Sequence, residues 1–264
     1  MNPFLSLNEP LIFDSHAHYQ FEAFDPDRDE LLSNFRGEGV DGAVICGSSL
    51  ENSRAAAQLA QMYPYLYASA GIHPGDVNEA GHFAENRDEL KSLLKLPKVV
   101  ALGEIGLDYH YPGTNRELQA EWFRGQLDLA AALNLPVIIH NRDAHADTLA
   151  ILKEAKPKGV VHCFSGSPEM AADVVKLGMY IGLGGTVTFK NAKTPLEIAK
   201  LVPIERLLLE TDAPYLAPDP YRGKRCDSRH IAITAAKIAQ VRGQTVETIL
   251  KATKENAYRL FNLI

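Results

Sequence analysis

The chain has 264 residues, a formal net charge of -6 and 46% hydrophobic residues, which is ordinary for a globular protein. The acidic balance argues against coating a nucleic-acid backbone, so nucleic-acid contact should be local, through a small basic rim or through metal. No apolar run reaches the ~20 residues of a membrane span, and the N-terminus lacks a signal peptide's basic and apolar regions. Three widely spaced cysteines form no disulfide framework, which favours a reducing, cytoplasmic setting.

Apolar runs of strand length alternate along the chain with longer segments of helical periodicity. The runs are continuous in hydrophobicity, as expected for parallel strands that are buried on both faces. The predicted strands are Leu11–His16, Gly42–Cys46, Leu66–Gly71, Val99–Ile105, Pro136–His140, Gly159–Cys163, Tyr180–Gly184 and Leu207–Thr211. The predicted helices are a segment from Asp25 to Gly37, then Glu51–Met62, Asn86–Leu96, Asn115–Asn134, Ala144–Ala155, Pro168–Leu177, Pro195–Leu201, and a final pair near Asp227–Arg242 and Val246–Phe261.

Eight strand–helix units in 264 residues predict an α/β protein with a (β/α)8 TIM-barrel fold. The alternative is a doubly wound open sheet, which would place a glycine-rich nucleotide loop after the first strand. The segment Ser15-His16-Ala17-His18-Tyr19 is not such a loop. Because we find no repeat, low-complexity tract or linker, we expect residues 1–264 to form a single domain.

Histidines and carboxylates stand at the carboxyl ends of several predicted strands, where TIM barrels carry their chemistry. His16 and His18 are two residues apart and should point the same way, because side chains alternate faces along a strand. Alone, this His-x-His pair is as consistent with an ordinary strand end as with metal binding. Further candidates stand at other strand ends, and together they favour a metal site: His73, Glu104, His140, His162 and Asp212.

Six of these residues are candidate metal ligands, and six suit two cations better than one. A single catalytic zinc ion typically takes three protein ligands. Two ions about 3.5–4 Å apart can share a carboxylate and a water. We expect Glu104 to bridge them, with His16, His18 and Asp212 completing one site and His140 and His162 the other.

The chemistry that follows is hydrolysis by a metal-bridging hydroxide, because metals lower the pKa of bound water. Asp212 would take the proton of that hydroxide and pass it to the leaving group. Asp212 and the bridging Glu104 are therefore the predicted catalytic residues.

Basic residues in the loops after predicted strands 5, 7 and 8 favour a phosphoester substrate. Arg142, Lys190 and the segment Tyr221-Arg222-Gly223-Lys224-Arg225 lie there. Barrels often bind phosphate after strands 7 and 8, and guanidinium groups suit phosphate geometry. Basic loop residues are also common without any ligand. The candidate substrate contacts are His73, Arg142, Ser165, Arg222 and Lys224.

Six segments, in this order along the chain, resemble the signatures of the TatD family of metal-dependent hydrolases. They are Phe13-Asp14-Ser15-His16-Ala17-His18, Gly71-Ile72-His73-Pro74, Gly103-Glu104-Ile105-Gly106-Leu107-Asp108-Tyr109, Pro136-Val137-Ile138-Ile139-His140-Asn141-Arg142-Asp143-Ala144, His162-Cys163-Phe164-Ser165-Gly166 and Leu209-Glu210-Thr211-Asp212-Ala213-Pro214-Tyr215-Leu216. The resemblance implies an amidohydrolase-like TIM barrel with a divalent metal centre. It maps the metal positions onto His16, His18, Glu104, His140, His162 and Asp212.

The resemblance also implies a range of activities. Family members described as deoxyribonucleases cleave DNA, often from the 3′ end, with magnesium or a similar ion, and some relatives act on aminoacyl-tRNA esters. Two positions depart from the family pattern, Cys226 where many members have asparagine and His110 where another aromatic residue is common. Both bear on substrate preference. Four histidine ligands favour zinc, manganese or nickel over magnesium, so we expect two divalent ions, with Mg, Mn or Zn left open.

Three functional hypotheses follow. The first is a deoxyribonuclease that acts on exposed nucleic-acid ends, of the 3′-5′ exonuclease type, as a monomer or weak oligomer. The second is an amide or ester hydrolase of the amidohydrolase kind, such as an aminoacyl-ester deacylase, with the same metal machinery. The third is a non-enzymatic scaffold with a vestigial metal site. A histidinol-phosphatase-type barrel also begins with His-x-His, but it usually needs further histidine–aspartate motifs that this chain lacks.

Overall fold

The computed structural model describes residues 10–263 and shows eight parallel strands, each hydrogen-bonded to the next along the chain. Their bounds are β1 Ile12–Ala17, β2 Val40–Cys46, β3 Leu66–Ala70, β4 Val99–Asp108, β5 Val137–Arg142, β6 Gly159–Val161, β7 Tyr180–Leu183 and β8 Leu207–Leu209. The eight predicted strands and the (β/α)8 barrel are confirmed. The single domain over 1–264 stays a prediction, since 1–9 and 264 lie outside the described residues.

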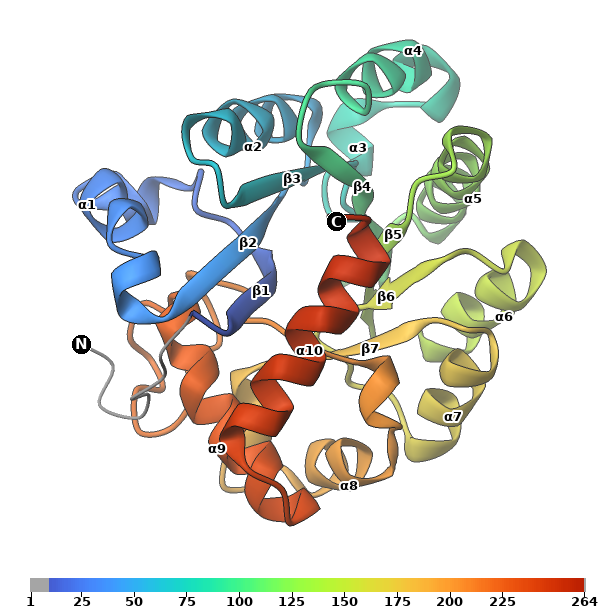
Figure 1. The fold of residues 1–264 in the computed structure, drawn as a ribbon. Helices are drawn as coiled ribbons and strands as arrows, with labels where there is room; N and C mark the ends of the chain where they lie inside the picture. The colour runs from blue at the N-terminus through green and yellow to red at the C-terminus, as the bar shows by residue number, and fades with distance from the viewer. Residues whose placement is uncertain (1–9, 264) are drawn as a thin grey trace.

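Helices alternate with the strands and surround the barrel (Figure 1). Their bounds are α1 Arg28–Ser33, α2 Leu50–Met62, α3 Val77–Ala80, α4 Phe83–Leu93, α5 Arg116–Leu133, α6 His145–Ala155, α7 Pro168–Lys176, α8 Lys193–Leu201, α9 Ile231–Arg242 and α10 Val246–Phe261. Side chains of Ser49, Asn115 and Ser167 accept hydrogen bonds from the first turns of α2, α5 and α7, so local sequence starts these helices. Within residues 10–263, no helix combines the length and the apolar character needed to cross a membrane.

The first predicted helix is shorter than the sequence pattern indicates. Helix α1 ends at Ser33, and the 310 turn η2 (Arg36–Glu38) leads to Gly39, whose φ is 84°. The sequence also gives no sign of α3, which is only four residues long and leads from the loop after β3 toward α4. Both differences lie outside the sheet, so neither moves the strand ends that carry the candidate ligands.

The barrel closes between β1 and the segment that follows β8. Residues Ala17 and Ala213 form a parallel bridge, and the His18 amide donates to the Ala213 carbonyl at 2.8 Å. The buried carboxylate of Asp14 accepts hydrogen bonds from the Thr211 amide at 3.1 Å and the Thr211 hydroxyl at 2.6 Å. These bonds hold the end of β1 against the segment after β8, on which Asp212 lies.

The amino-terminal half of the barrel interior is apolar. Ile138, Val160 and Leu208 pack there in a buried cluster, together with Leu260 and Phe261 of α10. Figure 1 shows α10, in red, lying across one end of the barrel. Helix α10 therefore closes the amino-terminal end, and the carboxyl-terminal end is left for the functional site.

We expect Leu260→Ala to lower the free energy of unfolding by about 2–5 kcal/mol. The substitution removes a fully buried side chain with which α10 packs against the apolar floor of the barrel. Urea denaturation measures this loss. Leu201→Ala at the end of α8 is the matched control, because Leu201 is 61% exposed and its truncation should cost far less. Equal losses for the two variants would contradict the closing role of α10.

Candidate metal centre

Side-chain alternation places polar groups directly above the apolar floor of the barrel. Two positions beyond Ile138, Val160 and Leu208, the same interior face carries His140, His162 and Glu210 in turn. His162 and Glu210 are buried, and His140 is half-buried. The local strand pattern therefore produces a polar layer at the carboxyl-terminal end.

Glu104 lies at the centre of this layer, and its two carboxylate oxygens face different histidines. Oε1 is 2.8 Å from His140 Nδ1 and 2.7 Å from His162 Nε2. Oε2 is 3.4 Å from His16 Nε2 and 3.7 Å from His18 Nε2. The carboxylate thus divides four imidazoles into two pairs, as expected for a residue between two ligand sets.

Asp212 completes the group on the side of β1. Its Oδ1 is 3.5 Å from His18 Nε2 and 3.6 Å from His16 Nε2, and its side chain is 20% exposed. Its amide donates to the His16 carbonyl at 3.0 Å. The structure therefore brings together all six predicted ligands, which we call the candidate metal centre: His16, His18, Glu104, His140, His162 and Asp212.

Hydrogen bonds around the candidate metal centre fix which ring nitrogen carries the proton. His18 Nδ1 lies 2.9 Å from the Cys46 carbonyl, and His140 Nε2 lies 3.2 Å from Asp108 Oδ2. In a neutral ring the proton then sits on that outer nitrogen, and the inner nitrogen presents a lone pair. For His140 this lone pair, on Nδ1, faces Oε1 of the Glu104 carboxylate. Two hydrogen-bond acceptors then face each other with no proton between them, which is unfavourable. A cation resolves that conflict, and the donor set therefore fits a divalent metal.

Asp108 and Glu210 are functional candidates that were not among the site residues predicted from the sequence. Asp108 orients His140, and Glu210 Oε1 lies 3.6 Å from His162 Nδ1, the outer nitrogen of that ring. Gly182 makes room for Glu210, because a Cβ there would lie 2.4 Å from its Oε2. Only their positions in the sequence could have indicated these two residues. Asp108 ends β4, which carries Glu104, and Glu210 is two residues before Asp212.

His73 lies beside the candidate metal centre but differs from the candidate ligands. Its Nδ1 accepts a hydrogen bond from the Gly75 amide at 2.9 Å, so the proton of a neutral ring lies on Nε2. Burial and the neighbouring His140 lower the pKa of His73 to about 4, which keeps the ring neutral at pH 7. Nε2 is 3.9 Å from Glu104 Oε1, so His73 presents an N–H donor to the site.

The predicted substrate contacts have different neighbours in the structure. Arg142 ends β5 and lies 5.5 Å from the ring centroid of Tyr111. Arg222 lies 4.3 Å from the ring centroid of Phe189, and Lys224 is exposed nearby in sequence. The hydroxyl of Ser165 donates to the Asn141 carbonyl at 3.4 Å. Ser165 therefore lies beside the end of β5 that carries Arg142, whereas Arg222 contacts Phe189, which follows β7.

One member of the basic loop has a structural partner. Arg225 forms two hydrogen bonds with the Asp27 carboxylate, at 2.7 and 2.5 Å, and its guanidinium covers Phe24. The pair ties the loop to the start of α1. Arg222 and Lys224 remain as the exposed cations of this loop among the described residues.

The two positions that depart from the family pattern are not part of the candidate metal centre. Cys226 is buried, and its amide donates to the Pro214 carbonyl at 2.9 Å. His110 is exposed and pairs with Asp143 at 2.8 Å. Neither residue belongs to any of the potential metal-binding groups found in residues 10–263.

Comparison with known proteins decides the family. A family model described as TatD related DNase matches residues 13–262. The chain belongs to the TatD family.

Similar proteins include an "Uncharacterized metal-dependent hydrolase YabD" from Bacillus subtilis, 42% identical over 256 residues, which are 96% of this chain and 100% of the relative. The "3'-5' ssDNA/RNA exonuclease TatD" of Citrobacter rodentium is 35% identical over 260 residues, covering 96% of this chain and 98% of the relative. A crystal structure of the TatD homolog YJJV from Escherichia coli superposes with a TM-score of 0.90 at 34% identity, covering 96% and 98% of the chains. The chain is therefore a metal-dependent hydrolase with the TIM barrel of the TatD family.

The charges of this TatD-family site are strongly coupled. Burial raises the pKa of Glu104, but His162, His16 and the other imidazoles outweigh burial and lower it well below its usual value. Burial lowers the pKa of His162, but Glu104 and Glu210 raise it well above its usual value. Without a cation, a proton on His162 therefore balances the negative charge of Glu104.

This coupling predicts how the metal-free protein responds to pH. A histidine whose pKa is raised on folding stabilises the protein below pH 6.5, and that stabilisation is lost as pH rises through the folded-state pKa. We expect the free energy of unfolding in EDTA to fall between pH 7 and 9, and to fall less in Glu104→Gln, because that variant removes the main cause that raises the pKa of His162. Urea denaturation across this range measures the difference.

Glu121→Gln is the matched control for this prediction. Glu121 raises the pKa of His82, but both side chains are exposed, so screening by solvent should leave the pH dependence nearly unchanged. Identical pH profiles for Glu104→Gln and the unchanged protein would contradict the coupling.

Proposed function

We propose that this TatD-family hydrolase is a divalent-metal-dependent deoxyribonuclease that removes nucleotides from exposed strand ends. The observation that carries the proposal is the division of four imidazoles by the two oxygens of Glu104, which suits two cations at a site for phosphodiester hydrolysis. The family description as TatD related DNase and the exonuclease name of the Citrobacter rodentium relative support it.

One cation would be held by His16, His18, Asp212 and Oε2 of Glu104, and the other by His140, His162 and Oε1 of Glu104. Bound there, divalent cations supply positive charge to the phosphoryl oxygens and lower the pKa of water. The four imidazoles suit zinc better than magnesium, whereas manganese accepts both imidazole and carboxylate ligands. Asp108 and Glu210 would hold His140 and His162 in the orientation that presents their lone pairs inward.

Asp212 is the proposed proton carrier. Burial raises its pKa, but the hydrogen bond from His18 and the charges of the histidines outweigh burial and keep the pKa below its usual value. The carboxylate is therefore ionised at pH 7 and can accept the proton of the attacking water. The water oxygen bonds to phosphorus, the bond to the departing sugar oxygen breaks, and Asp212 returns the proton to that oxygen.

The shape and charge of the molecule favour strand ends over intact duplex. The candidate metal centre is recessed and mostly buried within the barrel mouth, whereas the backbone of an intact duplex lies on the outside of a wide helix. A net charge of -6 with exposed Arg222 and Lys224 on one loop suits local contact with one or two phosphates. The ester-hydrolase alternative uses the same ligands, so the choice of substrate in the experiments decides between them. The cytoplasmic setting and the oligomeric state stay predictions.

We expect Asp212→Asn to lower kcat on a single-stranded oligonucleotide by about 10²–10⁴-fold, because the neutral amide cannot carry the proton. The experiment loads purified protein with magnesium, manganese or zinc, measures bound metal by elemental analysis, and follows 3′- and 5′-labelled oligonucleotides. The labels also report the cleavage polarity.

Asp143→Asn is the matched control, since Asp143 is exposed and pairs with His110 outside the candidate metal centre. Two findings would count against the proposal. One is metal-loaded protein that leaves single-stranded and 3′-recessed DNA intact, and the other is equal activity of Asp212→Asn and the unchanged protein. A small neutral ester as the best substrate would favour the ester-hydrolase alternative.

The double variant Arg222→Ala/Lys224→Ala should raise KM for the oligonucleotide about tenfold, since two exposed cations of the loop after β8 are lost. Each single-strand phosphate contact contributes about 0.7 to the logarithmic salt dependence, so the slope should fall by about 1.4. Kinetics between low and physiological salt measure both effects. Arg87→Ala/Lys158→Ala removes two exposed cations elsewhere on the barrel and should leave KM unchanged, and equal KM values for both double variants would exclude the loop as a contact.

A further inference from the structure

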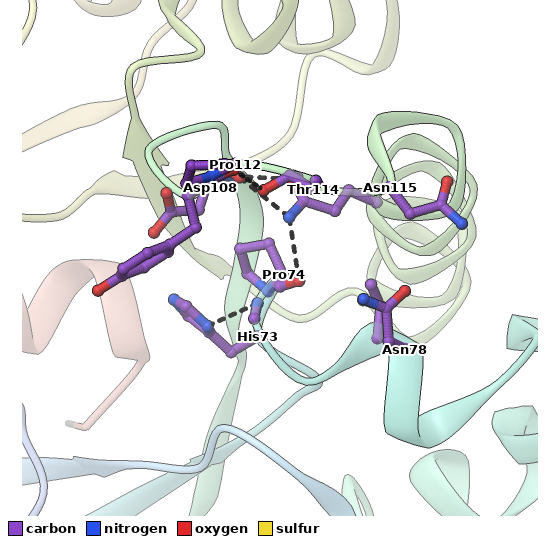
Figure 2. A pocket seen from close by; sticks show the side chains of 12 residues that line it. His73, Pro74, Asn78, Asp108, Pro112, Thr114 and Asn115 are labelled. Carbon is purple, nitrogen blue, oxygen red and sulfur yellow. Dashed lines mark hydrogen bonds between the residues drawn. The ribbon is translucent and has the colours of Figure 1, made fainter.

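A cavity of about 290 Å³ opens beside the candidate metal centre, between the loops that follow β3 and β4 (Figure 2). His73 and Asp108 lie on one side of it, and Asn78 and Asn115 lie on the other. His73 also approaches Glu104 to 3.9 Å, so one wall of the cavity is shared with the metal centre. A group bound in the cavity would therefore be adjacent to the reacting atoms.

The lining of the cavity offers no cationic side chain. It includes no lysine or arginine, and its one carboxylate is already occupied. Oδ1 of Asp108 accepts the His110 amide at 2.9 Å, and Oδ2 faces His140 at 3.2 Å. Asn78, Thr114 and Asn115 supply uncharged polar groups. A free phosphate would find no cation here, whereas a neutral group with hydrogen-bonding atoms would be accommodated.

Tyr111 adds an aromatic surface to this lining. Its side chain is 63% exposed, although it lines the cavity, and the Arg142 guanidinium lies 5.5 Å from its ring centroid. An exposed aromatic ring next to a polar cavity is the arrangement on which nucleic-acid bases stack. The arginine can hold the ring in place and meet a backbone phosphate at the same time.

The cavity is held together by the buried side chain of Gln119 from α5. Its Nε2 donates to the carbonyls of Pro74 and Asp108 at 3.1 and 3.0 Å, and its Oε1 accepts the Asp108 amide at 3.0 Å. These bonds join the loops after β3 and β4, so the cavity exists before any ligand arrives. A preformed site loses less entropy when a ligand binds.

From these features we infer that the cavity binds the terminal nucleoside of the substrate strand, with its base on Tyr111 and its phosphate at the candidate metal centre. The volume is at the lower limit of the roughly 300–1,000 Å³ of small-molecule pockets, so one nucleoside fits and a second does not. His73 lies between the cavity and the metal centre. Its Nε2–H donates to an oxygen of the phosphate that is bonded to the nucleoside in the cavity and lies at the metal centre.

This inference rests on the proposed function and specifies how the strand end is recognised. The nucleoside in the cavity stays bonded to the phosphate that water attacks. The bond that breaks joins that phosphate to the rest of the strand, whose sugar oxygen leaves with the proton. Each turnover then releases one nucleotide, and cleavage within a strand is disfavoured because the cavity has room for only one nucleoside.

The test compares two oligonucleotides whose attacked terminal residue either carries thymine or is a base-free tetrahydrofuran analogue. In the metal-loaded protein, kcat/KM should be about tenfold higher with thymine, because base–aromatic stacking is lost in the analogue. Tyr111→Ala should abolish this preference, and Tyr111→Phe should retain it, because stacking needs the ring and not the hydroxyl. The readout is the ratio of kcat/KM for the two oligonucleotides in each protein, and hydrolysis of the small diester bis(p-nitrophenyl) phosphate shows only that the metal centre is active.

A binding measurement gives a second readout that does not depend on turnover. Calorimetry should show thymidine 5′-monophosphate binding to the metal-loaded protein about tenfold more weakly in Tyr111→Ala, with 2-deoxyribose 5-phosphate unaffected by the change. An unchanged thymine preference in Tyr111→Ala, with DNA still degraded, would overturn the nucleoside cavity and leave the nuclease proposal intact. Protein that degrades no oligonucleotide but hydrolyses the small diester would refute the nuclease proposal, and the calorimetric difference would still decide whether the cavity accepts a nucleoside.

Discussion

The structure depends on one negative charge placed among four imidazoles inside a barrel. Glu104 is buried, and water that would stabilise its charge is largely excluded. Its oxygens contact ring nitrogens of His140 and His162 on one side and approach those of His16 and His18 on the other. Such an arrangement requires positive charge, which protons supply in the metal-free protein and divalent cations can supply in its place. The surrounding carboxylates then determine which nitrogens remain free to bind a cation.

The parallel barrel compensates for the free energy that it costs to bury this charge. Because side chains alternate along each strand, the same interior face is apolar near α10 and polar two residues later. The apolar floor supplies packing energy, and the polar layer contributes the chemistry. The bonds from Asp14 to Thr211 hold the seam between β1 and the segment after β8 at the height of Asp212. Stability and function therefore occupy different layers of one interior.

The fold and the six candidate ligands could be predicted from the sequence for a geometric reason. Parallel strands bring their carboxyl ends to one edge, so His16, Glu104 and His162 must meet once the strands are located. The pairing of Asp108 with His140 could not be predicted, because the register of β4 against β5 shifts between Leu102 and Ile105. The ion pair of Arg225 with Asp27 was equally hidden, because its partners are 198 residues apart and both lie in loops. Sequence pattern locates strand ends, whereas side-chain partners depend on local irregularities and on distant loops.

The mouth of the barrel has two chemically different sides. The cavity between the β3 and β4 loops carries no cation, whereas the loop after β8 presents Arg222 and Lys224. A polyanionic strand lying across the mouth would place its charged backbone toward the β8 loop. Its last nucleoside is the uncharged part that can enter a cavity without cations, because the phosphate that precedes it can remain at the metal centre. The two sides together therefore select a strand end, because only the terminal nucleoside is not bonded to a second phosphate.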